Sequence, residues 1–294
     1  MAKLICSTIR EGYSIDQIRR TMTVGELIDF LTQYDEDTPV YLSFDNGYTY
    51  GGITEERFEE DYGEDTQIET ILETLRASLA KTIIFVGNNV RAAETAAFLP
   101  EKNVLFAFTS AAGRRESNYV DSVDLRKITV GPLRNAPSQG RLIQEIFTGT
   151  KYKVTYEPNM EDYLLCHAAF VLPAVFACYK TDGSLKKLKK DNAYLNRLID
   201  ANIEGYRAIR NTGHEILPDA DKEFEGAKYC KTCFRFFKLM CATALGKICA
   251  SDHAMNAVDE MRALNRDMKA FFDAAGAKYP VWQALEAECG RYLL

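Results

Sequence analysis

The sequence LLCHAAFVLPAVFACY, residues 164–179, is a run of almost unbroken apolar character that only His167 and Pro173 interrupt. A membrane-spanning helix needs about 20 such residues, so this run is short for a span. Inside a water-soluble domain the same composition is typical of a helix that is covered on every side. We therefore predict a buried core helix and no membrane segment, and we expect this helix to form the centre of a helical domain.

The chain beyond residue 158 is predicted to be helical to its end. Glycines, prolines and polar clusters of the kind that stop helices fall at 181–183, 211–225, 246–250 and 276–280. These breaks divide the segment into about five helices. We predict an all-α C-terminal domain over residues 158–294.

Upstream of that domain, short apolar strand patterns alternate with helical spacing. Strands are predicted at 82–86, 104–108, 127–130 and 152–156, and helices at 67–80 and 138–147. This order predicts a partial Rossmann-like parallel sheet, an α/β domain over residues 67–157. Ligands bind at the carboxyl ends of such strands, which here carry Asn88, Asn89, Thr109 and Ser110.

Residues 1–66 differ from the rest of the chain in charge. They hold five basic and 15 acidic side chains, a net charge of −10, which leaves +4 for the remaining residues. A helix is predicted at 23–34 and a hairpin from strands 40–44 and 48–53, and the acidic run 55–66 follows as a linker or solvated face. We predict a small acidic α+β segment joined near Gln67, whose hairpin covers an edge of the following sheet.

Composition excludes several classes of protein. A hydrophobic content of 47% excludes general disorder, and a mildly positive body suits a small anionic ligand better than nucleic acid. The eight cysteines lack the spacing of a disulfide framework, and Cys230 and Cys233 have no second pair that would complete a zinc site. No secretory signal pattern opens the sequence, so we expect a cytoplasmic protein without a metal.

A dinucleotide-binding glycine loop is missing from the sequence. Such a loop needs glycines two residues apart, because the backbone must approach the pyrophosphate at the N-terminus of a helix. None of the 18 glycines has another glycine at that spacing. The pair Gly51-Gly52 stands in an acidic stretch that would repel phosphate.

Several motifs occur in a consistent order from Gln67 to the end of the chain. They are FVGNN at 85–89, FTSAAGRRES at 108–117, TVGPL at 129–133, KVTYEPNMEDYLLCHAAFVLP at 153–173 and SDHAMNAVDEMRAL at 251–264, followed by Gly276 and Pro280. In this order the motifs resemble the ketopantoate reductase (2-dehydropantoate 2-reductase) family, whose members join a Rossmann domain to a helical C-terminal domain. Here the resemblance lacks the glycine-rich first half of the Rossmann domain.

The resemblance implies reduction of a 2-keto acid to the 2-hydroxy acid with NADPH, an oxidoreductase reaction of pantothenate biosynthesis. It implies that Asn88 lies near the nicotinamide and the substrate, that Asn89 replaces the usual glycine, and that Glu260 binds substrate. The family's catalytic lysine aligns with Leu164, and a family asparagine aligns with Ala168. His167 is then the nearby candidate for the acid that protonates the product.

Two further groups of residues are candidates for ligand binding. His253, Asn256 and Glu260 are spaced to share one helical face with Asp252 at its start, which favours either a substrate site or a solvated face. Arg114 and Arg115 follow a strand and would meet a cofactor phosphate or a substrate carboxylate, or else form surface ion pairs. His167 has the alternative role of a buried histidine whose hydrogen bonds are satisfied within the core.

Two functions follow from these patterns. The first is a reductase of the ketopantoate type with His167 and Glu260 as its principal catalytic residues. The second is a non-catalytic protein, in which a small acidic domain is fused to a truncated reductase body that acts as a structural or interaction module, and which can form a homodimer. Nucleotide binding distinguishes the two.

Overall fold

The computed structural model describes residues 4–7, 20–44, 49–52, 64–115, 120–243 and 246–293. The chain divides into two compact units, Met1–Glu69 and Thr70–Leu294. Helix α2 (Glu64–Ala77) runs across the division. The predicted separation of residues 67–157 from 158–294 stays a prediction.

The first unit contains a three-stranded sheet of β1 (Leu4–Ser7), β2 (Val40–Phe44) and β3 (Thr49–Gly52), in which β2 pairs parallel with β1 and antiparallel with β3. The hairpin pairing is as predicted, while its turn and residues 53–63, which include most of the acidic run 55–66, lie outside the described residues. Helix α1 (Val24–Leu31) begins with a capping box, because the Thr23 hydroxyl accepts from the Glu26 amide and the Glu26 carboxylate accepts from the Thr23 amide. The described hairpin strands pair with each other and with β1 in this sheet, and the prediction that the hairpin covers an edge of the second sheet stays a prediction.

The second unit begins with a four-stranded sheet in the order β4 (Thr82–Val86), β5 (Asn103–Arg115), β6 (Val120–Gly131) and β7 (Lys153–Tyr156). Strands β4 and β5 are parallel and so are β6 and β7, but β5 and β6 are antiparallel. The sheet is therefore Rossmann-like but mixed, and β5 and β6 are longer than their apolar patterns predict. Helices α3 (Ala92–Ala97) and α4 (Gly140–Phe147) complete this part.

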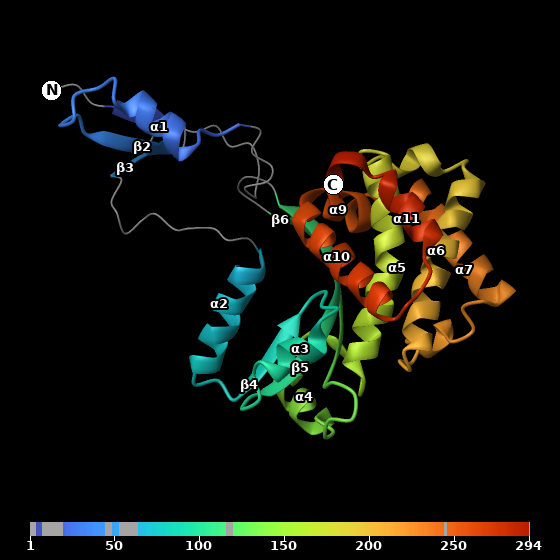
Figure 1. The fold of residues 1–294 in the computed structure, drawn as a ribbon. Coiled ribbons are helices and arrows are strands. Elements are labelled where there is room, and N and C mark those ends of the chain that lie inside the picture. The colour runs from blue at the N-terminus through green and yellow to red at the C-terminus, as the bar shows by residue number, and fades with distance from the viewer. Residues whose placement is uncertain are drawn as a thin grey trace. The chain divides into compact units, whose positions relative to one another are not determined.

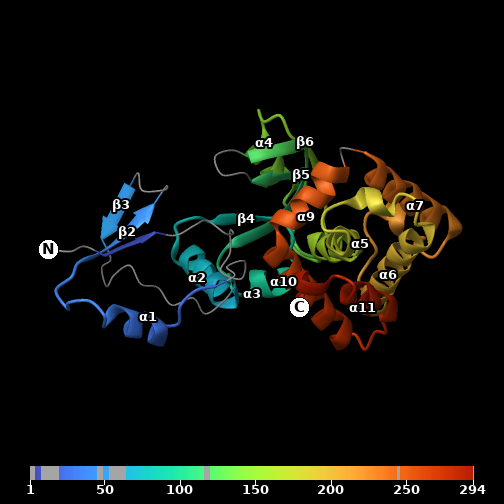
Figure 2. The same cartoon turned by 90° about the horizontal axis from the view of Figure 1, so that it is seen from above.

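The helical part surrounds α5 (Met160–Lys180), which contains the quoted apolar run. Figure 2 shows α5 end-on, with α6 (Asn192–Asn211), α7 (Ala227–Ala242), α10 (Val258–Ala274) and α11 (Pro280–Ala287) around it, and Figure 1 shows the same helices from the side. In the described part of the chain α5 alone is long and apolar enough to cross a membrane, but 72% of its apolar window is buried inside the protein. The prediction of a core helix is confirmed.

Short helical turns connect these helices: η4 (Leu185–Leu188), η5 (Asp219–Asp221), η6 (Lys247–Asp252), α9 (His253–Asn256) and η7 (Gly290–Tyr292). The predicted break at 246–250 is instead mostly the π-helix η6, which leads directly into α9. A break follows at Ala257, whose φ of −118° and ψ of 40° separate α9 from α10. The expected continuous helix from His253 to Glu260 is therefore wrong.

Candidate functional site

A cavity of about 390 Å³ lies between the strands β5 and β6 and the surrounding helices. Helices α5, α6 and α7 supply most of its wall, and η6, α9 and α10 close the remaining side. The described polar side chains that line it are an amide, two hydroxyls and two imidazoles: Asn88, Thr109, Ser110, His167 and His253. The rest of the wall is apolar or carries thiols.

Asn88 reaches this cavity because β4 ends in an abrupt change of backbone direction. Gly87 still donates its amide to Ala107 of β5, but its φ of 135° is one that L side chains rarely adopt. The next residue, Asn88, donates from Nδ2 to Oε1 of Glu260 on α10 at 2.8 Å. Its Oδ1 is buried and accepts no hydrogen bond from the described residues. The structure thus joins two predicted residues and leaves one amide oxygen for another donor.

His167 projects from α5 between this cavity and a second one. Its ring centroid lies 3.9 Å from that of Phe108, and no described residue is hydrogen bonded to it. Burial lowers the pKa of His167 to about 4. The imidazole is therefore neutral at pH 7, and it can donate a hydrogen bond through its N–H but does not hold an extra proton before a ligand binds.

The other candidates on the C-terminal helices have separate surroundings. His253 lines the cavity from the start of α9. Asn256 is exposed and donates from Nδ2 to the backbone oxygen of Asp252 at 2.7 Å, and the Asp252 carboxylate accepts from Lys247 Nζ at 2.6 and 2.7 Å. These hydrogen bonds of Asp252 and Asn256 are made within their own helical segment.

The remaining candidates lie on the sheet side. Asn89 donates from Nδ2 to Thr95 Oγ1 at 3.2 Å, so it braces the turn before α3. Arg114 and Arg115 are the last residues of β5, where their backbones lie opposite those of Asp121 and Val120 in the antiparallel register with β6. They occupy the extension of β5 beyond the predicted strand.

The positions that align with the family's lysine and asparagine are both buried. Leu164 is 1% exposed and packs with Phe106 and Met160, and Ala168 is 1% exposed within the main helical core. Neither position can hold a polar group that reaches the cavity without disturbing that packing. Of residues 164–168 of α5, His167 is the one that lines the cavity.

Sequence reasoning missed the cavity walls that α6 and α7 supply, through Leu195, Leu198, Phe236 and Phe237. Helical periodicity predicts that such residues are covered but not which neighbour covers them. The strand-end residues Thr109 and Ser110 were expected near a ligand, and they border the cavity where the register of β5 against β6 shifts. Bulges of this kind often occur beside active sites.

The described cysteines are all free, and the described residues contain no group of three or more histidine, cysteine or acidic side chains suited to a metal ion. Cys233 is buried on α7, where burial raises its pKa to about 11. A thiol in this state is a poor nucleophile and a poor metal ligand at neutral pH.

Comparison with known proteins gives a match in fold. No protein-family model matches the sequence, and no curated protein matches it. Dimeric ketopantoate reductase from Staphylococcus aureus is similar in structure, with 11% identity, a TM-score of 0.59, and coverage of 78% of this chain and 74% of that one. 2-Dehydropantoate 2-reductase from Geobacter metallireducens is also similar, with 12% identity, a TM-score of 0.60, and coverage of 76% of this chain and 73% of that one.

A D-mandelate dehydrogenase solved with NADH is also similar, with 12% identity, a TM-score of 0.54, and coverage of 78% of this chain and 76% of that chain. At these identities the likeness establishes the fold. The chain has the ketopantoate reductase fold, a partial Rossmann-like sheet followed by a helical C-terminal part.

Proposed function

We propose that this protein is a ketopantoate-reductase-like oxidoreductase that binds a 2-keto acid in the 390 Å³ cavity and reduces it to the 2-hydroxy acid with NADPH. The fold supports the reaction class, because the similar structures include ketopantoate reductases and a dehydrogenase solved with NADH. The observation that carries the proposal is the hydrogen bond between Asn88 and Glu260, residues 172 positions apart.

Among the described residues, the Asn88 side chain has a hydrogen-bond partner for its amide nitrogen but none for its amide oxygen. Its Nδ2 donates to Glu260, while its buried Oδ1 accepts nothing from the described residues. Leaving a buried acceptor without a donor costs about 1–3 kcal/mol. The hydroxyl of a 2-hydroxy acid is a donor of suitable size, and its binding would recover this free energy. The amide and the carboxylate together would fix the reacting end of the ligand.

The cavity wall suits the remainder of such a ligand when that remainder is apolar. The lining residues that the structure describes include no lysine or arginine, so the donors that they offer to the ligand's carboxylate are neutral. The hydroxyls of Thr109 and Ser110 are available beside the sheet. Since burying a carboxylate without hydrogen bonds is costly, we expect it to stay at this polar border and the side chain to enter the cavity.

His167 is the proposed proton donor. Burial holds its pKa at about 4, so the free protein presents a neutral ring. A bound carboxylate or a developing alkoxide would raise this pKa, because a nearby negative charge favours the protonated form. Coupling between substrate and proton uptake is therefore part of the proposal.

The residues described around the cavity do not fit the pyrophosphate of NADPH. The turn after β4 contains one glycine, and α3, the helix that follows, has six residues and begins after Arg91, which is paired with Glu94. Among the described residues, no lysine or arginine lines the cavity. We derive no hydride-transfer step from this arrangement, and cofactor binding is the first part of the proposal to test.

A second candidate function is a non-catalytic small-molecule-binding protein. The burial of Leu164 and Ala168 favours it, because a reductase of this fold is expected to place polar groups there. Under this alternative the cavity still binds its ligand, but no nucleotide is required.

Calorimetric titration with NADPH, followed by an assay of keto-acid-dependent NADPH oxidation, separates the candidates. The reductase proposal expects saturable NADPH binding, and it expects Glu260→Ala and His167→Ala to lower kcat far more than they lower nucleotide affinity. For loss of an acid catalyst the expected decrease is about 10²–10⁴-fold. Glu145→Gln is a matched control, because Glu145 is an exposed residue of α4 paired with Arg141.

Each outcome has a defined meaning. If NADPH does not bind at millimolar concentration but a keto acid still raises the melting temperature, the second candidate replaces the first. If neither ligand binds, both are wrong. Unchanged turnover in Glu260→Ala and His167→Ala would remove these residues from the site.

A further inference from the structure

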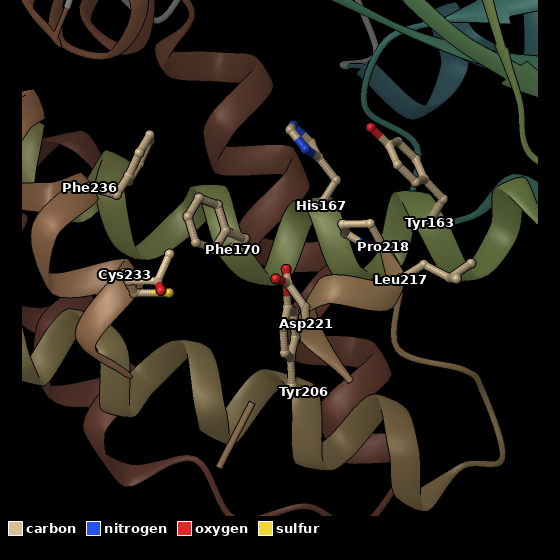
Figure 3. A pocket seen from close by; sticks show the side chains of 10 residues that line it. Tyr163, His167, Phe170, Tyr206, Leu217, Pro218, Asp221, Cys233 and Phe236 are labelled. Atoms are coloured by element: carbon tan, nitrogen blue, oxygen red, sulfur yellow. The ribbon is translucent and has the colours of Figure 1, made fainter. Parts of the chain in front are cut away.

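A second cavity, of about 220 Å³, lies on the other side of His167 and is lined largely by aromatic rings. Figure 3 shows its wall, which α5, α6, α7 and the segment around η5 build together. Five of its side chains are aromatic: Tyr163, His167, Phe170, Tyr206 and Phe236. Its volume is below that of a typical drug-sized pocket, so it suits a small group.

One carboxylate, that of Asp221 at the end of η5, lines this aromatic cavity. In Figure 3 it points toward the stretch of α5 that carries Phe170 and His167. Its Oδ2 accepts the hydroxyl of Tyr206 at 3.1 Å. Within the described part of the chain the Asp221 carboxylate has no other hydrogen bond and no ion pair with a lysine, arginine or histidine.

The absence of a cationic partner is unusual for a half-buried carboxylate, because charged groups removed from water are normally paired. Its neighbour in η5 illustrates the contrast, since Asp219 is exposed and pairs with Lys222 at 2.8 Å. Burial raises the pKa of Asp221, and the Tyr206 hydroxyl offsets only part of this effect. Burial and, after it, the charge of Asp221 raise the pKa of Tyr206. The cavity therefore has a negative field that no cation of the described residues neutralises.

The aromatic rings add to this preference for positive charge. The face of an aromatic ring is negative, and a cation over it gains about 0.5–2 kcal/mol, more when it is removed from water. A strongly hydrated ion would have to lose its water to enter a cavity lined by aromatic rings. An alkylammonium group carries a positive charge but presents apolar alkyl carbons at its surface. A carboxylate beside several rings is the arrangement that selects such a group.

We propose that the cavity formed by Tyr163, Phe170, Tyr206, Asp221 and Phe236 binds an alkylammonium group of a small-molecule ligand, with the Asp221 carboxylate as its counter-ion. This site requires neither NADPH nor a keto acid, so it stands or fails independently of the proposed reductase activity.

Choline chloride is a suitable probe, and 3,3-dimethylbutan-1-ol is its uncharged carbon analogue of nearly equal shape. We expect calorimetry on the full chain to give at least tenfold tighter binding of choline than of the alcohol. Asp221→Asn removes the charge but keeps an oxygen that can accept from Tyr206, so the fold should persist. We expect this variant to lower choline affinity at least tenfold and to leave binding of the alcohol unchanged.

Asp219→Asn is the matched control, because it makes the same chemical change two residues away at an exposed position. It should bind choline like the unaltered protein. Phe236→Leu provides a second test, since Phe236 is 40% exposed and its replacement leaves the core intact. This variant should weaken choline binding more than alcohol binding. Equal affinity for the two probes, no choline binding at millimolar concentration, or full choline affinity in Asp221→Asn would each overturn the proposal.

Discussion

Replacing Asp162 by asparagine should cost a large part of the stability of the second unit. Asp162 lies in the first turn of α5 with no exposed surface. Its carboxylate accepts from Asn159 Nδ2 at 2.6 Å, from His214 Nδ1 at 2.5 Å and from the Glu215 amide at 2.7 Å. The bonds from His214 and Glu215 connect the start of α5 to the segment that follows α6. Asparagine keeps one acceptor oxygen and turns an NH₂ group toward the remaining donors.

The magnitude follows from the number and kind of bonds that are lost. A hydrogen bond to a charged group contributes about 1.5–3 kcal/mol, and breaking a buried ion pair costs about 3–5 kcal/mol. Because one acceptor survives, we expect the free energy of unfolding to fall by about 3–4 kcal/mol. Trp282 provides the signal, since it is the single tryptophan of the chain and is fully buried in the helical core.

Urea unfolding followed by Trp282 fluorescence measures this change. Glu145→Gln is the control, because the Arg141–Glu145 pair is exposed and its loss should cost less than about 0.5 kcal/mol. A decrease of less than about 1 kcal/mol for Asp162→Asn would refute the reasoning, since it would mean that the three bonds add no more than one ordinary hydrogen bond.

The Asp162–His214 pair also predicts how the contribution of Asp162 to stability depends on pH. Burial raises the pKa of Asp162, but the hydrogen bonds from His214, Glu215 and Asn159 outweigh this effect, so the pKa of Asp162 lies below its ordinary value of 3.8. The hydrogen bond to Asp162 raises the pKa of His214 above its ordinary value of 6.5, although partial burial opposes this effect. The contribution of Asp162 is present above its ordinary pKa and is lost as pH falls through the lowered value. The contribution of His214 is present below 6.5 and is lost as pH rises through the raised value.

The stability difference between the unaltered protein and Asp162→Asn should therefore be largest between pH 3.8 and 6.5 and decrease on either side. Urea titrations at several pH values measure it. A difference that rises steadily from pH 6 to pH 9 would contradict the assigned pairing with His214, because a neutral imidazole cannot strengthen the ion pair.

Two substitutions test the packing directly. Gly131→Ala should lower the free energy of unfolding by more than about 2 kcal/mol, because a Cβ there would lie 1.7 Å from the backbone oxygen of Glu157. Gly140→Ala is the control and should be close to neutral, since the atom nearest to its Cβ is 3.9 Å away. Thermal melts compare the two variants, and equal melting temperatures would count against this packing. Leu164→Lys should lower the free energy of unfolding by about 3 kcal/mol or more, because the Leu164 side chain is 1% exposed. Leu239→Lys, at a position that is 52% exposed, should lower it by less than about 0.5 kcal/mol. Urea unfolding measures both, and a soluble Leu164→Lys variant with unchanged stability would show that this position is open to solvent.

Local patterns predicted the elements whose signals lie within a few residues of each other. Thr23 begins α1 as a capping residue, and strands β2 and β4 have the predicted bounds, because capping and short apolar runs depend on near neighbours. The break at Ala257 was not predicted. Residues 251–264 read as one helix, and no glycine or proline marks the point where α9 ends.

The sequence by itself determined that α5 is a core helix, that a sheet precedes it, and that no glycine loop for a dinucleotide is present. These features depend on composition and on spacing along one segment. Tertiary structure alone decided that β5 and β6 are antiparallel, that Leu164 is packed away while His167 borders two cavities, and that Asp221 has no cationic partner in the described part of the chain. The physical reason is that helical periodicity specifies which face is covered, whereas the neighbour that covers it comes from a distant segment, and a side chain's charge and hydrogen bonds are set by that neighbour.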